Sequence, residues 1–218
     1  MPTRKELERR AYTCEVRAEE SNQDGVIGKI IVGRPIVYNS RTDLGWFDEI
    51  IESGALTMTD LKDVRFLVNH DTSRIPLARS RRNNGNSTMQ LIVDDQGLGV
   101  NVQLDTENNS EARALYSAVQ RGDITGMSFM FAVADEEWEN LDTDHPTRRI
   151  REISSVVEVS AVTFPAYEST EIYARSKEAL ENARQTLENA KQQRAKPVET
   201  ETLTLLKEKT KILGGNSK

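Results

Sequence analysis

The chain contains little cysteine, histidine or aromatic residue. Its 218 residues include one cysteine, Cys14, two histidines, His70 and His145, and 6% aromatic residues. A single cysteine excludes an intrachain disulfide and a cysteine zinc cluster, so we expect a reducing compartment. Two histidines exclude a histidine-rich metal centre, and any histidine-based catalysis must use one of them. We therefore expect neither a cofactor nor a metal.

Long hydrophobic runs are also missing. No stretch approaches the about 18 consecutive apolar residues of a membrane helix, and residues 1–10 are charged where a signal peptide would be apolar. We expect a soluble intracellular protein without a membrane partner.

Positive charge is scarce in most of the chain. Residues 1–170 carry 19 Lys and Arg against 28 Asp and Glu, whereas residues 171–218 carry 10 basic against 7 acidic residues. Binding to a phosphate backbone depends on clustered Lys and Arg. The acidic body therefore argues against a nucleic-acid partner.

The composition changes near Tyr173, which is the last aromatic residue. Five of the six prolines and ten of the twelve glycines precede it. We expect one domain over residues 1–173 and a helical C-terminal tail over residues 174–218.

The tail has the pattern of an amphipathic helix that Pro197 interrupts. A second short helical pattern follows over residues 203–213. The first helix has a thin apolar stripe, spaced 3, 4 and 3 residues apart, that consists of Leu180, Ala183, Leu187 and Ala190. Such a stripe suits either an interaction tail or a solvated appendage.

Strand patterns dominate the first 170 residues. A helix is predicted from a cap at Asn109 or Ser110 to a stop at Gly122, and a helical turn over residues 55–60. Seven short strands with few helices favour an antiparallel barrel or sandwich with helices outside. The predicted strands cover residues 12–17, 29–38, 64–68, 89–93, 100–104, 129–133 and 156–162.

Three segments hold residues suited to chemistry. His70 follows the predicted strand 64–68, Ser128 follows a glycine at the start of a strand, and Glu158 lies within an apolar strand. Each has a plain structural alternative: a turn histidine, a turn serine and a solvent-facing carboxylate. If the three side chains meet, the carboxylate orients the imidazole, which then takes the hydroxyl proton. Sequence spacing alone does not establish that meeting.

Several motifs over residues 28–170 resemble, in order, those of the tailed-bacteriophage prohead (procapsid maturation) serine proteases. They are Tyr38-Asn39-Ser40, Thr42-Asp43-Leu44-Gly45, Phe47-Asp48-Glu49-Ile50-Ile51, Asn69-His70-Asp71 with Pro76-Leu77-Ala78-Arg79, Gly97-Leu98, Gly126-Met127-Ser128-Phe129, and Glu158-Val159-Ser160-Ala161-Val162-Thr163-Phe164-Pro165-Ala166-Tyr167.

The resemblance implies a mainly β fold like that of the herpesvirus assemblin proteases, a small antiparallel β-barrel surrounded by helices. It also implies that His70 is the general base and Ser128 the nucleophile. Glu158 is the expected third member because of its strand context, and Asp71 is the second choice. Assemblins use a second histidine, but His145 lies in a polar loop beside a proline.

The resemblance further implies a serine endopeptidase that acts inside the procapsid, in the host cytoplasm. Its expected partners are the phage scaffold and the major capsid protein. Because members of this family often degrade themselves, we also expect self-cleavage. A homo-oligomer is also compatible with the resemblance.

Two other functions compete with this hypothesis. One is a non-catalytic capsid-assembly or scaffolding protein of the same fold, which binds through its helical tail. The other is a metal-dependent hydrolase that uses Asp142, Asp144 and His145. Three ligands within four loop residues make an awkward coordination geometry, which argues against the metal hypothesis.

Overall fold

The computed structural model describes residues 7–14, 16–23, 26–163 and 170–195. The chain divides into two compact units, Met1–Leu180 and Glu181–Lys218. A helix, α2 (Thr170–Ala195), begins before the predicted boundary at residue 173. The second predicted tail helix lies outside the described residues.

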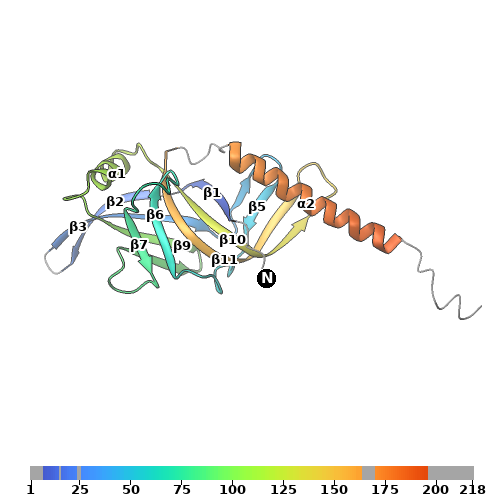
Figure 1. The fold of residues 1–218 in the computed structure, drawn as a ribbon, viewed down its shortest axis with the longest axis horizontal. Coiled ribbons are helices and arrows are strands. Elements are labelled where there is room, and N and C mark those ends of the chain that lie inside the picture. The colour runs from blue at the N-terminus through green and yellow to red at the C-terminus, as the bar shows by residue number, and fades with distance from the viewer. Residues whose placement is uncertain (1–6, 15, 24–25, 164–169, 196–218) are drawn as a thin grey trace, which may run out of the picture. The chain divides into compact units, whose positions relative to one another are not determined.

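Strands make up most of the first unit (Figure 1). In chain order they are β1 (Glu8–Thr13), β2 (Val16–Gln23), β3 (Val26–Val37), β4 (Arg41–Asp43), β5 (Asp48–Ile51), β6 (Asp63–Val68), β7 (Ala78–Arg81), β8 (Met89–Asp94), β9 (Gly97–Leu104), β10 (Gly126–Glu139) and β11 (Thr147–Val162). One helix, α1 (Ser110–Arg121), lies between β9 and β10.

The described strands form two sheets. The first has seven strands in the order β1-β10-β11-β5-β4, with β6 paired to β11 and β7 paired to β6. The second has four strands in the order β2-β3-β9-β8. The mainly β class is therefore confirmed, but these strands do not close into a barrel.

Two further details differ from the predicted antiparallel barrel with surrounding helices. Strands β5 and β6 both run parallel to β11, so the larger sheet is mixed. The described residues contain only α1 and α2 as helices. Parallel neighbours need a connection between strands that leads back across the sheet, and periodicity along one strand does not reveal such a connection.

Strand β11 is the organising strand of the larger sheet. It pairs along one edge with β10 and along the other with β5 near its start and β6 near its end. Figure 1 shows β10 and β11 as long strands side by side. Strand β11 can pair with both β5 and β6 along one edge because its 16 residues leave room for two short strands in succession.

Helix α1 forms where its capping residues predict it. The side chain of Asn109 accepts hydrogen bonds from the backbone N–H groups of Glu111 and Ala112, and Gly122 ends the helix at φ 78°. Its buried face consists of Ala112, Leu115, Tyr116 and Val119.

Some predicted boundaries were wrong. Residues 12–17 are not one strand, because the end of β1 and the start of β2 pair with different partners in different sheets. Residues 53–58 form turns and no helix. The short strands β4, β5 and β7 escaped prediction, since three or four residues carry little periodic signal.

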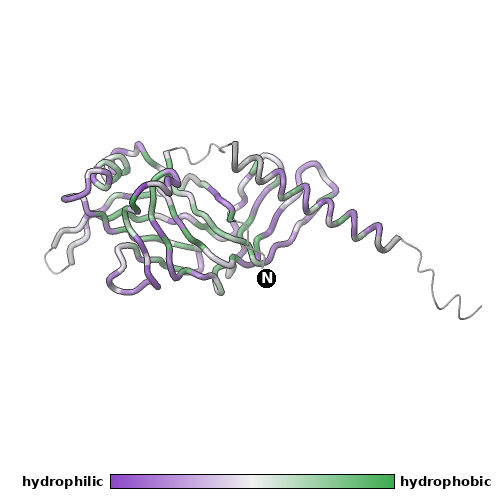
Figure 2. Tube along the Cα trace, in the orientation of Figure 1, coloured by the Kyte–Doolittle hydropathy of each residue, from purple (hydrophilic) through white to green (hydrophobic). Residues whose placement is uncertain are grey.

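The hydrophobic core consists of buried side chains from the strands of both sheets and includes most of the aromatic residues in the larger sheet. Phe66, Phe129 and Phe131 are fully buried, and Figure 2 shows hydrophobic residues recurring along the strands. A smaller cluster packs Leu180 of α2 against Leu44 and Phe47. Among the described residues, no helix has the length and apolar character needed to span a bilayer.

We predict that Gly97→Ala destabilises the protein by about 3 kcal/mol or more. Gly97 has a φ of 136°, and a Cβ there would lie 2.1 Å from the backbone oxygen of Ile36. Gly85→Ala is the matched control, because nothing lies within 4 Å of its Cβ position. Urea unfolding of both variants tests this, and equal stability would contradict it.

Candidate active site

Ser128 lies near the start of β10, with β1 on one side and β11 on the other. In the strand register it is opposite Ala11 of β1 and Ser160 of β11. The residue is fully buried. Its hydroxyl donates to the main-chain carbonyl of Arg10 at 2.7 Å, and its Oγ is 2.5 Å from Nε2 of His70.

His70 lies in the turn that follows β6. Asn69 and His70 have φ angles of 51° and 58°, and the backbone N–H of Asp71 donates to the carbonyl of Val68. These two left-handed residues turn the chain sharply at the strand end. Because β6 is a neighbour of β11, the turn carries the imidazole back over the larger sheet.

Glu158 lies on β11 and contacts the other ring nitrogen. Its Oε2 is 2.5 Å from Nδ1 of His70, and its Oε1 accepts a hydrogen bond from the hydroxyl of Ser160. The same Ser160 oxygen accepts the backbone N–H of His70 at 3.0 Å. Ser160 therefore holds both the carboxylate and the histidine turn.

The structure thus brings Ser128, His70 and Glu158 together in one chain of contacts. The two alternatives for the third member lie elsewhere. The carboxylate of Asp71 accepts from Ser73 and pairs with Arg74. The ring of His145 has Asp48 and Asp43 as its acidic neighbours, at 3.3 and 3.7 Å.

This exposed group of His145, Asp43 and Asp48 differs from the metal set considered from sequence. Its three possible ligand atoms lie within 4.8 Å of one another. Asp142 and Asp144, the loop acids proposed beside His145, do not belong to it. Exposed acidic groups of this kind are common without an ion.

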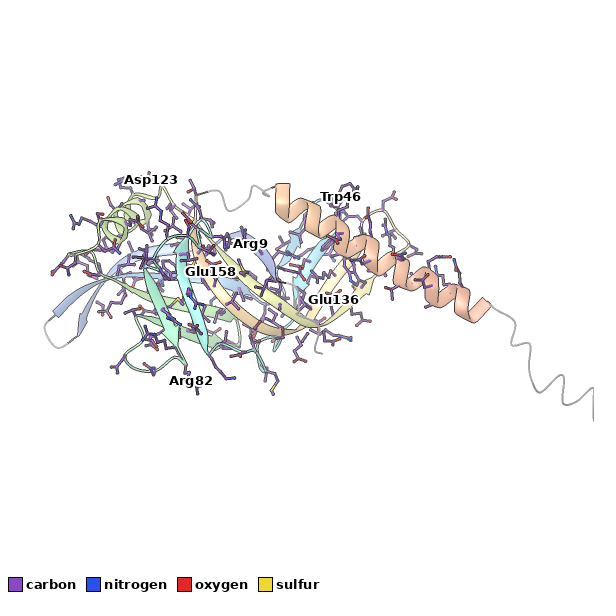
Figure 3. All side chains as sticks on the ribbon, in the orientation of Figure 1. Arg9, Trp46, Arg82, Asp123, Glu136 and Glu158 are labelled. Atoms are coloured by element: carbon purple, nitrogen blue, oxygen red, sulfur yellow. The ribbon has the colours of Figure 1, made fainter. Side chains whose placement is uncertain are left out.

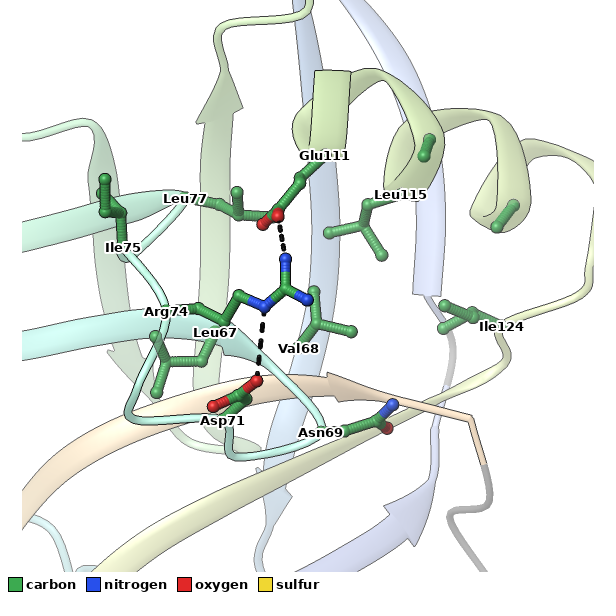
Figure 4. Close-up of a pocket in the computed structure, with 12 residues that line it drawn as sticks. Leu67, Val68, Asn69, Asp71, Arg74, Ile75, Leu77, Glu111, Leu115 and Ile124 are labelled. Atoms are coloured by element: carbon green, nitrogen blue, oxygen red, sulfur yellow. Dashed lines mark hydrogen bonds and ion pairs between the residues drawn. The ribbon is translucent and has the colours of Figure 1, made fainter. Parts of the chain in front are cut away.

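A cavity of about 440 Å³ lies between the histidine turn and α1 (Figure 4). Arg74 crosses it and pairs with Asp71 on one side and Glu111 on the other. Its apolar lining includes Leu67, Leu77, Leu115 and Ile124. The cavity therefore adjoins the loop that carries His70.

A second buried polar cluster joins β1, the edge strand of the larger sheet, to β5, β10 and β11. The guanidinium of Arg10 donates to both oxygens of Glu49, at 2.6 and 2.7 Å, and to Glu8 at 2.7 Å. Arg148 donates to Glu8 at 2.7 and 2.8 Å, to Glu49 at 3.1 Å, and to Glu136. Figure 3 shows Glu136 and Glu158 at separate places along β10 and β11.

These charges hold one another ionised despite their burial. Burial alone would raise the pKa of Glu8, but hydrogen bonds from Arg148 and the charges of Arg10 and Arg148 lower that pKa to about 2. Burial alone would lower the pKa of Arg10, but Glu49 raises it above its ordinary value. Arg148 keeps a raised pKa in the same way, mainly through Glu8 and Glu49.

Sequence reasoning missed Ser160 and the Arg10 cluster. Alternation along β11 already places Ser160 on the same face as Glu158, but no role followed from that pairing alone. Nothing in the sequence near Arg10 indicates that this arginine is buried. Its partner Glu49 is 39 positions away, and Arg148, which shares that carboxylate, is 138 positions away, so only the fold joins them.

We predict that Glu8→Gln makes stability less dependent on acid. The pKa of Glu8 is lowered in the folded protein, so its stabilisation, on the order of 2 kcal/mol, is complete above about pH 4.5 and disappears as pH falls toward 2. Part of the acid dependence of stability should remain in the Glu8→Gln protein, because Arg34 also lowers the pKa of Asp94 to about 2.

Urea unfolding at a series of pH values between 2 and 6 measures this dependence. The exposed Glu107→Gln, outside the cluster, is the control. A Glu8→Gln protein whose stability falls as steeply with acid as that of the wild type would contradict the prediction.

Comparison with known proteins places the chain among phage capsid proteases. A family model described as caudovirus prohead serine protease matches residues 12–186. The prohead protease of Enterobacteria phage HK97 is 33% identical over 166 residues, which are 74% of this chain and 66% of that protein, just under two thirds. The structure of the bacteriophage T4 capsid assembly protease matches 73% of this chain and 98% of that one, with 10% identity and a TM-score of 0.45.

Proposed function

The chain belongs to the caudovirus prohead serine protease family, and on that premise we propose that it is a serine endopeptidase of procapsid maturation. The observation that carries the proposal is the contact chain Ser128–His70–Glu158, with 2.5 Å at each of its two contacts. A buried carboxylate, an imidazole and a hydroxyl in this order have the arrangement that activates a serine.

Each residue has a distinct role in the proposed reaction. His70 takes the hydroxyl proton of Ser128 through Nε2, and Oγ attacks the carbonyl carbon of the scissile peptide bond. Glu158 holds the proton-bearing Nδ1 and stabilises the imidazolium that forms. His70 then gives its proton to the leaving amine, and water hydrolyses the acyl-enzyme.

Ser160 has a positioning role in this scheme. Its hydroxyl donates to Glu158 and accepts from the backbone of His70. A buried carboxylate with a fixed hydrogen-bond donor keeps one orientation, so the imidazole does too. The acid and base are thereby aligned before substrate arrives.

The proposed substrates are the phage scaffold or the scaffold-like segment of the major capsid protein, cleaved inside the procapsid in the host cytoplasm. Self-cleavage belongs to the same proposal, as does a homo-oligomer. The relative from phage HK97 is named a prohead protease, which supports this substrate class. The acidic body of this chain suits protein substrates better than nucleic acid.

We expect Ser128→Ala and His70→Ala each to reduce cleavage of the co-expressed scaffold by about 10³-fold or more. The double variant should be little worse than either single variant, because the residues act as a unit. Mass spectrometry of all new chain termini measures this.

Ser154→Ala is the control for that experiment, since Ser154 lies on β11 but its hydroxyl bonds only to the carbonyl of Ala132 in the described contacts. Normal trimming by Ser128→Ala would eliminate the proposed mechanism. It would also favour the alternative of a non-catalytic assembly protein of the same fold.

A second set of variants identifies the third member. Glu158→Gln keeps the size of the side chain but removes its charge, and we expect cleavage to fall by about 10²- to 10⁴-fold. Asp71→Asn and His145→Ala should stay within a few-fold of wild type, because neither side chain has a described contact with the His70 ring. Initial rates of cleavage of one scaffold substrate measure these losses. If Asp71→Asn or His145→Ala loses more activity than Glu158→Gln, that residue and not Glu158 is the third member.

The C-terminal tail, predicted over residues 174–218, is proposed to dock on the scaffold and to be removed by self-cleavage. Leu180 is buried against Leu44 and Phe47, so a truncation should begin after residue 180 and not at the predicted boundary at residue 173. We predict that ending the chain after residue 180 preserves peptidase activity and reduces incorporation into procapsids. Quantitative mass spectrometry of purified procapsids measures incorporation, and equal incorporation would refute docking.

A further inference from the structure

The proposed nucleophile is closed to substrate in this structure. Ser128 is fully buried, between β1 and β11. Strand β11 carries Glu158 and cannot leave without dismantling the site. Strand β1 is different, because among the described strands it forms the edge of the larger sheet and pairs with β10 alone. If β1 leaves, β10 becomes an open edge that a peptide strand can join.

The main chain of β1 already lies where a scissile bond would be needed. The carbonyl oxygen of Arg10 accepts the hydroxyl of Ser128 at 2.7 Å. A hydroxyl has one proton, and Ser128 donates it to this carbonyl, although Nε2 of His70 lies 2.5 Å from Oγ. The Arg10 carbonyl therefore competes with His70 for the hydroxyl proton of the nucleophile.

The side chain of Arg10 lies in a matching acidic pocket. Glu49 is fully buried and accepts two charge-assisted hydrogen bonds from Arg10, while Arg148 supplies one more at 3.1 Å. When β1 leaves, Arg10 and Glu8 leave together. Glu49 and Glu136 then remain with Arg148 as their cationic partner, a site with one negative charge in excess. A buried carboxylate without its main donor is costly until another cation replaces it.

We propose that β1 occupies the place of the substrate strand on β10, and that Arg10 stands for the substrate residue before the scissile bond. The enzyme then selects peptides with Arg or Lys at that position, where Glu49 binds the side chain. This inference rests on the proposed peptidase function. It adds a specificity pocket and a blocking strand that must leave before cleavage.

The reaction follows from that placement. With a substrate strand in place of β1, Ser128 Oγ bonds to the carbonyl carbon of the basic residue, and its proton moves to His70. The C–N bond to the next residue, in the place of Ala11, breaks as His70 protonates the leaving amine. Water then attacks the ester and gives one proton to His70. The C–Oγ bond breaks, His70 returns the proton to Ser128 Oγ, and the new carboxyl end is released.

The first experiment digests a synthetic mixed-sequence peptide library with the full-length wild type, with Ser128→Ala and with Glu49→Gln. We expect Ser128-dependent cuts after Arg or Lys at least about tenfold more often than after Gln. Glu49→Gln should reduce this preference about tenfold. Glu107→Gln, an exposed substitution outside the pocket, should leave it unchanged.

Three results separate the two proposals. Cuts after basic residues support both. Ser128-dependent cuts without a basic preference overturn the specificity pocket and leave the peptidase intact. No cleavage of either the library or the co-expressed scaffold contradicts the peptidase function itself. If Glu49→Gln does not fold, the wild-type profile still decides the preference.

The second experiment fixes β1 to β10 by a disulfide. Arg9 and Met130 are opposite in the register, so Arg9→Cys with Met130→Cys, in a Cys14→Ser background, links the two strands. We expect the oxidised protein to lose cleavage and labelling of Ser128 by a fluorophosphonate, and reduction to restore both. A link between Gln90→Cys and Asn101→Cys, opposite each other on β8 and β9, is the control. An oxidised β1 link that cleaves as fast as its reduced form would overturn the blocking role.

Discussion

The pairing of β11 with β10 and β6 is the constraint on which the rest of the structure depends. Strand β10 carries Ser128, β11 carries Glu158, and β6 leads directly into the turn that carries His70. Backbone hydrogen bonds fix the register of all three strands. A shift by one residue would turn Glu158 and Ser160 to the other face of the sheet. The contact chain therefore has the rigidity of a sheet and not of a set of loops.

Two groups of buried polar side chains lie against this sheet, and β1 connects them. Its main chain reaches the Ser128–His70–Glu158 group through the carbonyl of Arg10, while its side chains reach Glu49 and Arg148. Buried polar groups are stable only when each has its partners. Strand β1 supplies partners to both groups and is therefore held firmly. Among the described strands, however, it is hydrogen-bonded to β10 alone, so its release breaks the pairing with one strand. Occupancy of the site is thus coupled to the pairing of charges some distance away.

The same arrangement explains why burial and reactivity are compatible here. A serine that a strand covers is protected from substrate and water, and its proton is held by a carbonyl acceptor. Nothing in the contact chain of Glu158, Ser160 and His70 has to be rebuilt for it to act. What changes is the acceptor of a single proton.

The sequence by itself determined the local features: the capped helix α1, most of the strands, and the ordered motifs that bring His70, Ser128 and Glu158 forward as a set. These depend on neighbours a few residues apart, where periodicity and capping act. Only the tertiary structure decided that Glu158, and neither Asp71 nor His145, meets Nδ1 of His70, that the sheets stay open, and that Arg10 covers the serine. Those outcomes depend on parallel pairing, on register, and on charges that the fold joins across more than a hundred residues, so no local pattern could encode them.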